Sequence, residues 1–227
     1  MMKFNDDLAT EYEKGIRRTL PSYDAMLRLT QTFFQSALPD EAQFLVVGAG
    51  SGNEILQLAE QKPHWSFVGV DPAEAMLHFA KERLNTLPNN ITLLHGTLLD
   101  TKLPITQFDA ASCLLVLHFI ESYEEKLTTL KAIARHLKPG APFVLVSKYG
   151  QLGSTETELQ FDLWRAYWLQ HTKLTSEQVA DMEQSVRALS YMSEKDILTL
   201  LQEAGFSQPS RFFATTLFGG WICRKQN

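Results

Sequence analysis

Three glycines at alternate positions follow a short apolar run, and an aspartate closes the next apolar run. The glycines are Gly48, Gly50 and Gly52, and Asp71 lies 19 residues after the last of them. Glycine tolerates positive φ and lets the backbone approach a ligand closely, while the helix that begins after Gly52 leaves amide groups without partners in its first turn. A carboxylate on the neighbouring parallel strand can accept both hydroxyl protons of a ribose. The pattern therefore predicts a nucleoside site.

The spacing of the glycines narrows the class of ligand. They form GxGxG, whereas the dinucleotide-binding fingerprint is GxGxxG, and Gly52 is followed by Asn53-Glu54 rather than by the lysine of a phosphate-binding loop. Glu54 would stand in the first turn of the helix, where its charge repels a pyrophosphate. We therefore expect a nucleoside without phosphates, which disfavours a nicotinamide oxidoreductase.

Apolar runs alternate with stretches of helical pattern along most of the chain. Strands are expected at residues 44–47, 66–70, 91–94, 108–115 and 142–147, with helices at 53–61, 72–84 and 123–136. Such alternation is typical of right-handed βαβ units and a parallel sheet. A helix over 193–205 then precedes strands at 210–216 and 217–225, whose very short connection favours a hairpin and an antiparallel strand. The expected fold class is α/β: a Rossmann-like, seven-stranded, mostly parallel sheet with an antiparallel last strand and helices on both faces.

Two segments stand outside this alternation. Residues 1–41 would form a helical N-terminal cover over the domain of residues 42–227. Residues 150–190 are longer than a crossover needs, so we expect them to form a helical lid within that domain. The aromatic lid candidates are Trp164, Tyr167, Trp168 and His171.

Composition and charge exclude several classes of protein. The 227 residues include 21 Lys and Arg against 26 Asp and Glu, a formal net charge of −5. This balance does not indicate the excess of positive charge that is typical of proteins that bind nucleic acid. The longest apolar run, 113–117, is far shorter than the ~20 residues that span a bilayer. The first residues lack the apolar segment of a signal peptide, and Cys113 and Cys223 are too few for a disulfide framework or a metal cluster. We expect a cytoplasmic protein with no metal site and no membrane contact.

From about residue 40 onward the chain resembles the class I S-adenosylmethionine-dependent methyltransferases. The resemblance rests on Gly-Ala-Gly-Ser-Gly at 48–52, Gly-Val-Asp at 69–71, Gly-Thr-Leu-Leu-Asp at 96–100, Phe-Asp-Ala-Ala at 108–111 and Leu-Lys-Pro-Gly at 137–140. It implies S-adenosylmethionine as the cofactor and in-line transfer of its methyl group. Because that cofactor already carries the activated group, the protein mainly supplies alignment and exclusion of water.

The resemblance also implies which residues contact the cofactor. They are Tyr23, Gly48, Ala49, Gly50, Gly52, Asp71, Pro72, Met76, Thr97, Leu98 and Leu114. The glycine loop would pack against the amino-acid part of the cofactor, and Asp71 would hold the ribose. Pro72 and Met76 would flank the adenine, while Thr97 and Leu98 would cap its other face and edge. Many members carry an aspartate where Thr97 stands.

Residues 17–23, Arg-Arg-Thr-Leu-Pro-Ser-Tyr, resemble the pre-sheet region of the carboxy-S-adenosylmethionine synthase branch of this family. There, a tyrosine matching Tyr23 reaches the amino-acid end of the cofactor. Two positions depart from the branch: its fourth-strand asparagine is Leu114 here, and its carboxylate-binding arginine is Met182, with Arg187 nearby. Both departures favour plain S-adenosylmethionine and a transferred methyl group.

The acceptor side of the site carries two candidates for catalysis, His118 and Tyr149, which follow the fourth and fifth expected strands. A base is needed only if the acceptor must lose a proton. The leading hypothesis is methylation of a small-molecule substrate. The alternatives are a tRNA-modification enzyme of the carboxy-S-adenosylmethionine synthase type, transfer to a tRNA base or a protein, and a cofactor-binding module without turnover. Residues 1–41 carry 5 basic and 7 acidic side chains, so composition does not indicate a nucleic acid partner. The oligomeric state stays open, with a homodimer as one option.

Overall fold

The computed structural model describes residues 15–17 and 20–227. The helices are α2 (Tyr23–Ala37), α3 (Asn53–Gln61), α4 (Glu74–Leu84), α5 (Tyr123–His136), α6 (Thr155–His171), α7 (Ser176–Arg187) and α8 (Glu194–Glu203), with a 3-10 turn, η1, at Leu117–Phe119. The strands are β1 (Gln43–Val47), β2 (Ser66–Asp71), β3 (Ile91–His95), β4 (Ala110–Leu114), β5 (Pro142–Lys148), β6 (Phe206–Thr215) and β7 (Phe218–Lys225). Within this described part, no helix combines the length and the apolar character needed to cross a bilayer.

All the strands join one sheet in the order β3-β2-β1-β4-β5-β7-β6. Strands β1 to β5 pair in parallel, and β7 runs antiparallel to both of its neighbours. The strand order reverses between β1 and β4, and ligands of open α/β sheets bind outside the carboxyl ends of the strands at such a point. The predicted Rossmann-like sheet with an antiparallel last strand is confirmed.

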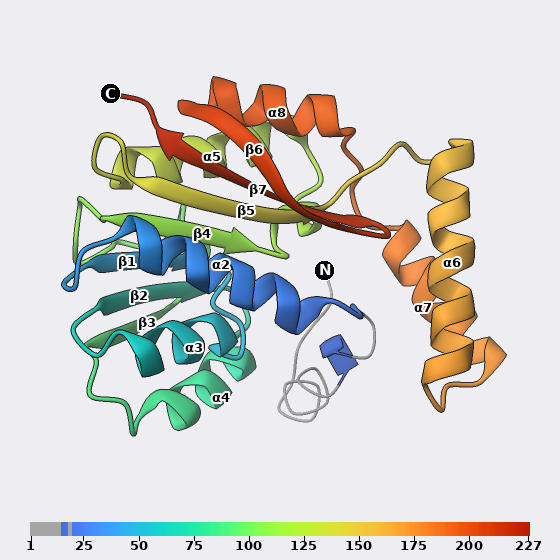
Figure 1. Cartoon of the computed structure of the whole chain (residues 1–227), viewed down its shortest axis with the longest axis horizontal. Coiled ribbons are helices and arrows are strands. Elements are labelled where there is room, and N and C mark those ends of the chain that lie inside the picture. Colours follow the sequence, from blue (N-terminus) through green and yellow to red (C-terminus); the bar gives the residue numbers. More distant parts are fainter. Residues whose placement is uncertain (1–14, 18–19) are drawn as a thin grey trace.

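Alternate side chains of each strand point into two apolar layers. Phe44 and Val46 of β1 pack in the layer that contains α2, α3 and α4, whereas Leu45 and Val47 pack in the layer that contains α5 and α8. Figure 1 shows α2 crossing one face of the sheet, α5 behind the sheet and α8 along its upper edge beside β6. Helices therefore cover both faces, and α2 packs beside α3, the helix that follows the glycine loop.

Helices α6 and α7 form a hairpin that follows β5. In Figure 1 this hairpin stands apart from the sheet, at the side toward which β4 and β5 point. Trp164 and Trp168 are buried in an apolar cluster built mainly by the hairpin itself. The rings of Tyr167 and His171 contact each other, with centroids 4.6 Å apart, and His171 is exposed. Of the four aromatic lid candidates, two therefore stabilise the hairpin and two lie nearer its surface.

Strand β6 begins earlier than its sequence pattern indicates. The pattern places the strand from residue 210, but the structure begins it at Phe206, with a register shift between Ser207 and Ser210. Gln208 adopts φ +52° in this bulge, and Pro209 lies beside it. A bulge leaves residues outside the ladder, so it accommodates a proline that has no N–H to donate. Pro209 thus lies inside β6, before the residue at which the expected strand begins.

Candidate functional site

The glycine loop between β1 and α3 is held to the neighbouring strand by its own backbone. The N–H groups of Gly48 and Ala49 donate to the Val70 carbonyl at 2.8 and 3.0 Å, and the Gly52 N–H donates to the Ala49 carbonyl at 2.9 Å. Gly48, Gly50 and Gly52 have φ of +78°, +51° and +79°, a region that residues with a Cβ adopt at a cost. The loop is therefore a rigid turn in which all three glycines are required by the backbone.

Asp71 ends β2 with its carboxylate turned toward this loop. Oδ2 accepts a hydrogen bond from the Gly50 N–H at 2.8 Å, and Oδ1 accepts one from the Ala73 N–H at 2.8 Å. The residue is 9% exposed, and burial raises its pKa, opposed by the two amides and by His95. Each carboxylate oxygen can accept a second hydrogen bond. The side chain thus lies against the glycine loop, with acceptor capacity left for a ligand, and its contact with a ribose stays a prediction.

A cavity opens at the same loop, beside α2 and the end of β4. Its lining residues are Tyr23, Met26, Leu27, Gly48, Ala49, Gly50, Ser51, Asn53, Glu54, Leu114 and Leu115. Five of these were assigned to the cofactor from the sequence: Tyr23, Gly48, Ala49, Gly50 and Leu114. The free volume is about 50 Å³, whereas one water needs about 10–15 Å³. In this state the cavity has room for the amino-acid end of a ligand but not for a whole nucleoside.

Helix α2 brings Tyr23 to this cavity. The Tyr23 hydroxyl accepts a hydrogen bond from Asn53 Nδ2 at 3.1 Å, and the Arg17 guanidinium lies over its ring, 5.4 Å from the centroid. Both Tyr23 and Asn53 are buried. Sequence reasoning missed Asn53, although its place directly after the third glycine could have identified it. Arg18 and Thr19 of the same N-terminal motif lie outside the described residues.

The residues assigned to the adenine lie where β2 and β3 end. Met76 and Leu98 are buried, whereas Pro72 and Thr97 are exposed. Thr97 Oγ1 donates a hydrogen bond of 2.6 Å to Asp100 Oδ2. A carboxylate is therefore present beside Thr97, although residue 97 itself is not acidic.

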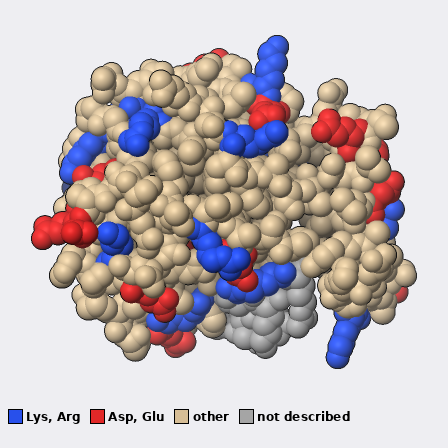
Figure 2. Space-filling model, viewed as in Figure 1, with Lys and Arg blue, Asp and Glu red and all other residues tan. Residues whose placement is uncertain are grey.

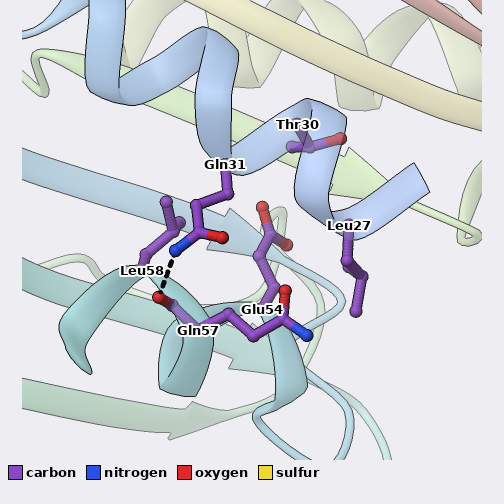
Figure 3. A pocket seen from close by; sticks show the side chains of 6 residues that line it. All are labelled: Leu27, Thr30, Gln31, Glu54, Gln57 and Leu58. Atoms are coloured by element: carbon purple, nitrogen blue, oxygen red, sulfur yellow. Dashed lines mark hydrogen bonds between the residues drawn. The ribbon is translucent and has the colours of Figure 1, made fainter. Parts of the chain in front are cut away.

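Glu54 is buried in the first turn of α3. Figure 3 shows its carboxyl rising toward α2, in a hollow that is also lined by Leu27, Thr30, Gln31, Gln57 and Leu58. Burial raises the pKa of Glu54 to about 7, and the Ser112 hydroxyl offsets part of this effect. The sequence argument assumed a fixed negative charge at this position. The structure corrects it: near neutral pH the carboxyl is only partly ionised.

Glu54→Gln is expected to stabilise the protein at alkaline pH. The folded-state pKa of about 7 lies above the ordinary glutamate value of 4.5, so the folded state holds the proton more tightly and loses this advantage as the pH rises through 7. At pH 8 the variant should gain on the order of 3 kcal/mol in the free energy of unfolding, and at pH 5 the gain should fall below about 1 kcal/mol. Denaturant unfolding at the two pH values measures this, with the exposed Glu60→Gln as control. A gain that is equal at both pH values would contradict the assignment.

His118, a candidate for catalysis, is buried on η1 among cationic side chains. Its Nδ1 accepts a hydrogen bond from the Lys148 backbone N–H at 3.2 Å. Burial, and then the charges of Lys148 and Lys126, lower its pKa to about 3. Its ring packs against those of Phe119 and Phe218, at centroid distances of 4.6 and 5.8 Å. The imidazole is therefore neutral at physiological pH, and the structure favours a packing role over acid–base work.

Tyr149, the other candidate for catalysis, is half-buried directly after β5. Its ring meets Trp221 edge-on at a centroid distance of 5.6 Å. Burial raises the pKa of its hydroxyl, opposed by Arg211. The phenol can donate or accept a hydrogen bond, but it supplies no phenolate near neutral pH. Its contact with an acceptor stays a prediction.

The positions that depart from the synthase branch carry no free cation. Leu114 presents an apolar side chain to the cavity, and Met182 packs against the core of the α6–α7 hairpin. Arg187 donates to both carboxylate oxygens of Glu158, at 2.9 and 2.7 Å, and to Glu183 at 2.8 Å. Arg187 is therefore paired with two carboxylates of the α6–α7 hairpin.

The two cysteines are buried and unpaired. Burial, together with the charge of Glu54, raises the pKa of Cys113 to about 12, so this thiol stays protonated. Across residues 15–17 and 20–227, no three His, Cys, Asp or Glu side chains gather in a way that could hold a metal ion.

The family described as "Methyltransferase domain" matches residues 45–143, from β1 to the start of β5, and so includes the glycine loop and Asp71. This part of the chain is therefore similar to methyltransferase domains, and its fold is that of solved S-adenosylmethionine-dependent methyltransferases. The family match covers the half of the sheet that surrounds the site. It leaves α2 and the α6–α7 hairpin outside.

Relatives of this chain cover nearly its whole length at low identity. The carboxy-S-adenosyl-L-methionine synthase of Nautilia profundicola is 22% identical over 224 residues, which is 98% of this chain and 94% of that protein. The synthase of Glaesserella parasuis is 25% identical, with 98% and 92% covered. Among solved structures, the magnesium protoporphyrin IX methyltransferase of Synechocystis has a TM-score of 0.65 at 17% identity, covering 92% of this chain and 86% of that one. This structural likeness shows the fold alone.

Proposed function

We propose that this protein is a methyltransferase that moves the methyl group of S-adenosylmethionine to a small-molecule acceptor. The observation that carries the proposal is the Asp71 carboxylate, which is buried beside the glycine loop, bound to the Gly50 N–H and able to accept the two hydroxyls of a ribose. The loop and Tyr23 would then contain the amino-acid end. The acceptor would approach from the carboxyl ends of β4 and β5, the side on which the α6–α7 hairpin stands (Figure 1).

The charges at the cavity support a ligand without phosphates. Its described lining residues include no lysine or arginine, and their one carboxyl belongs to Glu54. A diphosphate would have no cationic partner among them, although phosphate binding draws on such charge-assisted hydrogen bonds. This is the environment of a nucleoside that ends in an amino acid, not in a phosphate.

The surface charge supports a small acceptor over a nucleic acid. Figure 2 shows lysine and arginine side chains scattered over one face, with acidic side chains among them, and the net charge of the whole chain is −5. Nucleic acid binding depends on clustered cations that neutralise phosphates. No such cluster gathers on the face that Figure 2 displays.

The site also supports plain S-adenosylmethionine over a carboxylated form. An extra carboxylate buried at the transferred group would need a cation or N–H donors. Leu114 supplies neither, and Arg187 is held by Glu158 and Glu183. The similarity to carboxy-S-adenosyl-L-methionine synthases along 98% of the chain makes a synthase-type activity the second candidate.

Calorimetric titration separates these functions. S-adenosylhomocysteine should bind, NAD should give no heat, and carboxy-S-adenosylmethionine should bind at least about tenfold more weakly than S-adenosylmethionine, because its extra charge stays unpaired. Tighter binding of the carboxylated cofactor would favour the synthase-type activity. Absence of heat with S-adenosylhomocysteine would contradict the proposal as a whole.

Transfer itself is tested with S-adenosylmethionine labelled in its methyl group. The protein is incubated with a cell extract, which is then separated by size into small molecules, tRNA and protein. We expect the label in the small-molecule fraction, and none there with Asp71→Ala. Label in tRNA or protein would overturn the small acceptor, and binding without transfer to any fraction would indicate a module without turnover.

A further inference from the structure

Glu54 is the part of the site that the proposed function leaves unused. Its Oε1 is buried without a hydrogen-bond partner, and the Thr30 hydroxyl and the Gln57 amide oxygen, which line the same hollow (Figure 3), also lack partners. The hollow has no free volume for a water molecule. Burying an acceptor without a donor costs stability. The fold therefore maintains this carboxyl at a cost that packing does not explain.

The cavity at the glycine loop offers Glu54 the room that the hollow lacks. Glu54 lines this cavity as well, and its free volume is about 50 Å³. The first turn of α3 has N–H groups without acceptors in the helix, and its N-cap, Gly52, has no side chain to occupy them. The first-turn N–H groups of α3 can donate to a carboxylate, and the neighbouring Glu54 carboxylate can accept from an ammonium group. These are the two charged groups of a free amino acid.

We propose that Glu54 binds the α-ammonium group at the methionine end of the cofactor, while the first-turn amides of α3 receive the carboxylate of that end. This inference rests on the proposed function, because it takes S-adenosylmethionine as the ligand. An ammonium group brings three N–H donors and so supplies the partner that Oε1 lacks. A Glu54 that was protonated in the free protein releases its proton when the cofactor binds.

Among the described residues that line the cavity, no side chain offers Glu54 a positive charge. The titratable groups nearest to Glu54 are the Tyr23 phenol from α2, which lines the same cavity and is bonded to Asn53, and the Cys113 thiol of β4, whose pKa the charge of Glu54 raises. Neither is a cation, and no lysine or arginine is among the described lining residues. Of the groups in the described part of the site, a ligand is thus the source of positive charge that the proposal assigns to Glu54.

The test compares two ligands that differ only at the methionine end. S-adenosylhomocysteine carries the ammonium and the carboxylate, whereas 5′-methylthioadenosine ends in a methyl thioether. In calorimetric titrations at pH 7.5, Glu54→Gln should weaken S-adenosylhomocysteine binding about 10- to 100-fold, the loss of one charge-assisted hydrogen bond. It should leave 5′-methylthioadenosine affinity within about twofold, since that ligand does not reach the carboxyl. Glu60→Gln, exposed on the same helix, removes an equal charge and should change neither affinity.

The pH dependence gives a second readout. The affinity of the parent protein for S-adenosylhomocysteine should rise several-fold from pH 6 to pH 7.5, as Glu54 ionises, and the affinity of Glu54→Gln should stay flat. Equal weakening of both ligands, or no weakening of either, overturns the role of Glu54. Failure of the parent protein to bind either ligand overturns the cofactor site as well. The expected stability of Glu54→Gln separates a loss of binding from a loss of folding.

Discussion

Replacing Asp71 with alanine is expected to lower the affinity for S-adenosylmethionine and S-adenosylhomocysteine by about 10²- to 10⁴-fold. A hydrogen bond to a charged group contributes about 1.5–3 kcal/mol, and a tenfold change corresponds to 1.4 kcal/mol. Alanine would remove the acceptor that we propose for both ribose hydroxyls. The same substitution leaves the Gly50 and Ala73 N–H groups without their acceptor, which loosens the glycine loop. Calorimetric titration with S-adenosylhomocysteine measures the loss.

The free energy of unfolding must be measured together with the affinity, because Asp71 also accepts hydrogen bonds from the glycine loop and from Ala73. Asp71→Asn keeps one acceptor oxygen, so it should retain more of the free energy of unfolding than Asp71→Ala while still losing affinity. Asp40→Asn removes an exposed carboxylate near the opposite end of β1 and should bind as the parent does. Unchanged affinity in Asp71→Ala would refute the assignment of the ribose to this side chain.

Gly48→Ala is expected to lower the free energy of unfolding by about 2–5 kcal/mol. A Cβ at this position would lie 2.0 Å from Val116 Cγ2, and the residue has φ +78°. The left-handed backbone costs about 1–2 kcal/mol for a residue with a Cβ, and overpacking adds about 1–3 kcal/mol. Denaturant unfolding measures the loss, and cofactor binding should fall with it because the loop has to move.

Two controls divide this loss into its two causes. Gly140 has φ +74°, and a Cβ added there would have no neighbouring atom within 4 Å, so Gly140→Ala should show the backbone cost alone. In a Val116→Ala background the methyl group in conflict is absent, and Gly48→Ala should then cost about 1–2 kcal/mol. If Gly48→Ala costs no more than Gly140→Ala in the parent protein, close packing against Val116 does not determine the glycine.

The sequence predicted helices correctly where a glycine turn or a capping side chain marks the first residue. The helices expected at 53–61 and 123–136 match α3 and α5 to the residue, since the glycine loop ends at Gly52 and the Ser122 side chain caps α5 through the Glu125 N–H. The bulge at Gln208 and Pro209 escaped prediction, because only the pairing of β6 with β7 stabilises it.

The glycine loop and Asp71 were readable from the order of residues, because a parallel sheet brings the ends of successive strands to one edge. Contacts between distant segments were not readable. Tyr23 accepts a hydrogen bond from Asn53, 30 residues away in the sequence, and Arg187 donates to Glu158, 29 residues away. The charges of Lys148 and Lys126 act on His118. Burial decides the protonation of Glu54 and His118, and burial exists only once helices and sheet have packed. Residue order thus predicted the sheet and the place of Asp71 beside the glycine loop, while packing decided the protonation states of the buried side chains around them.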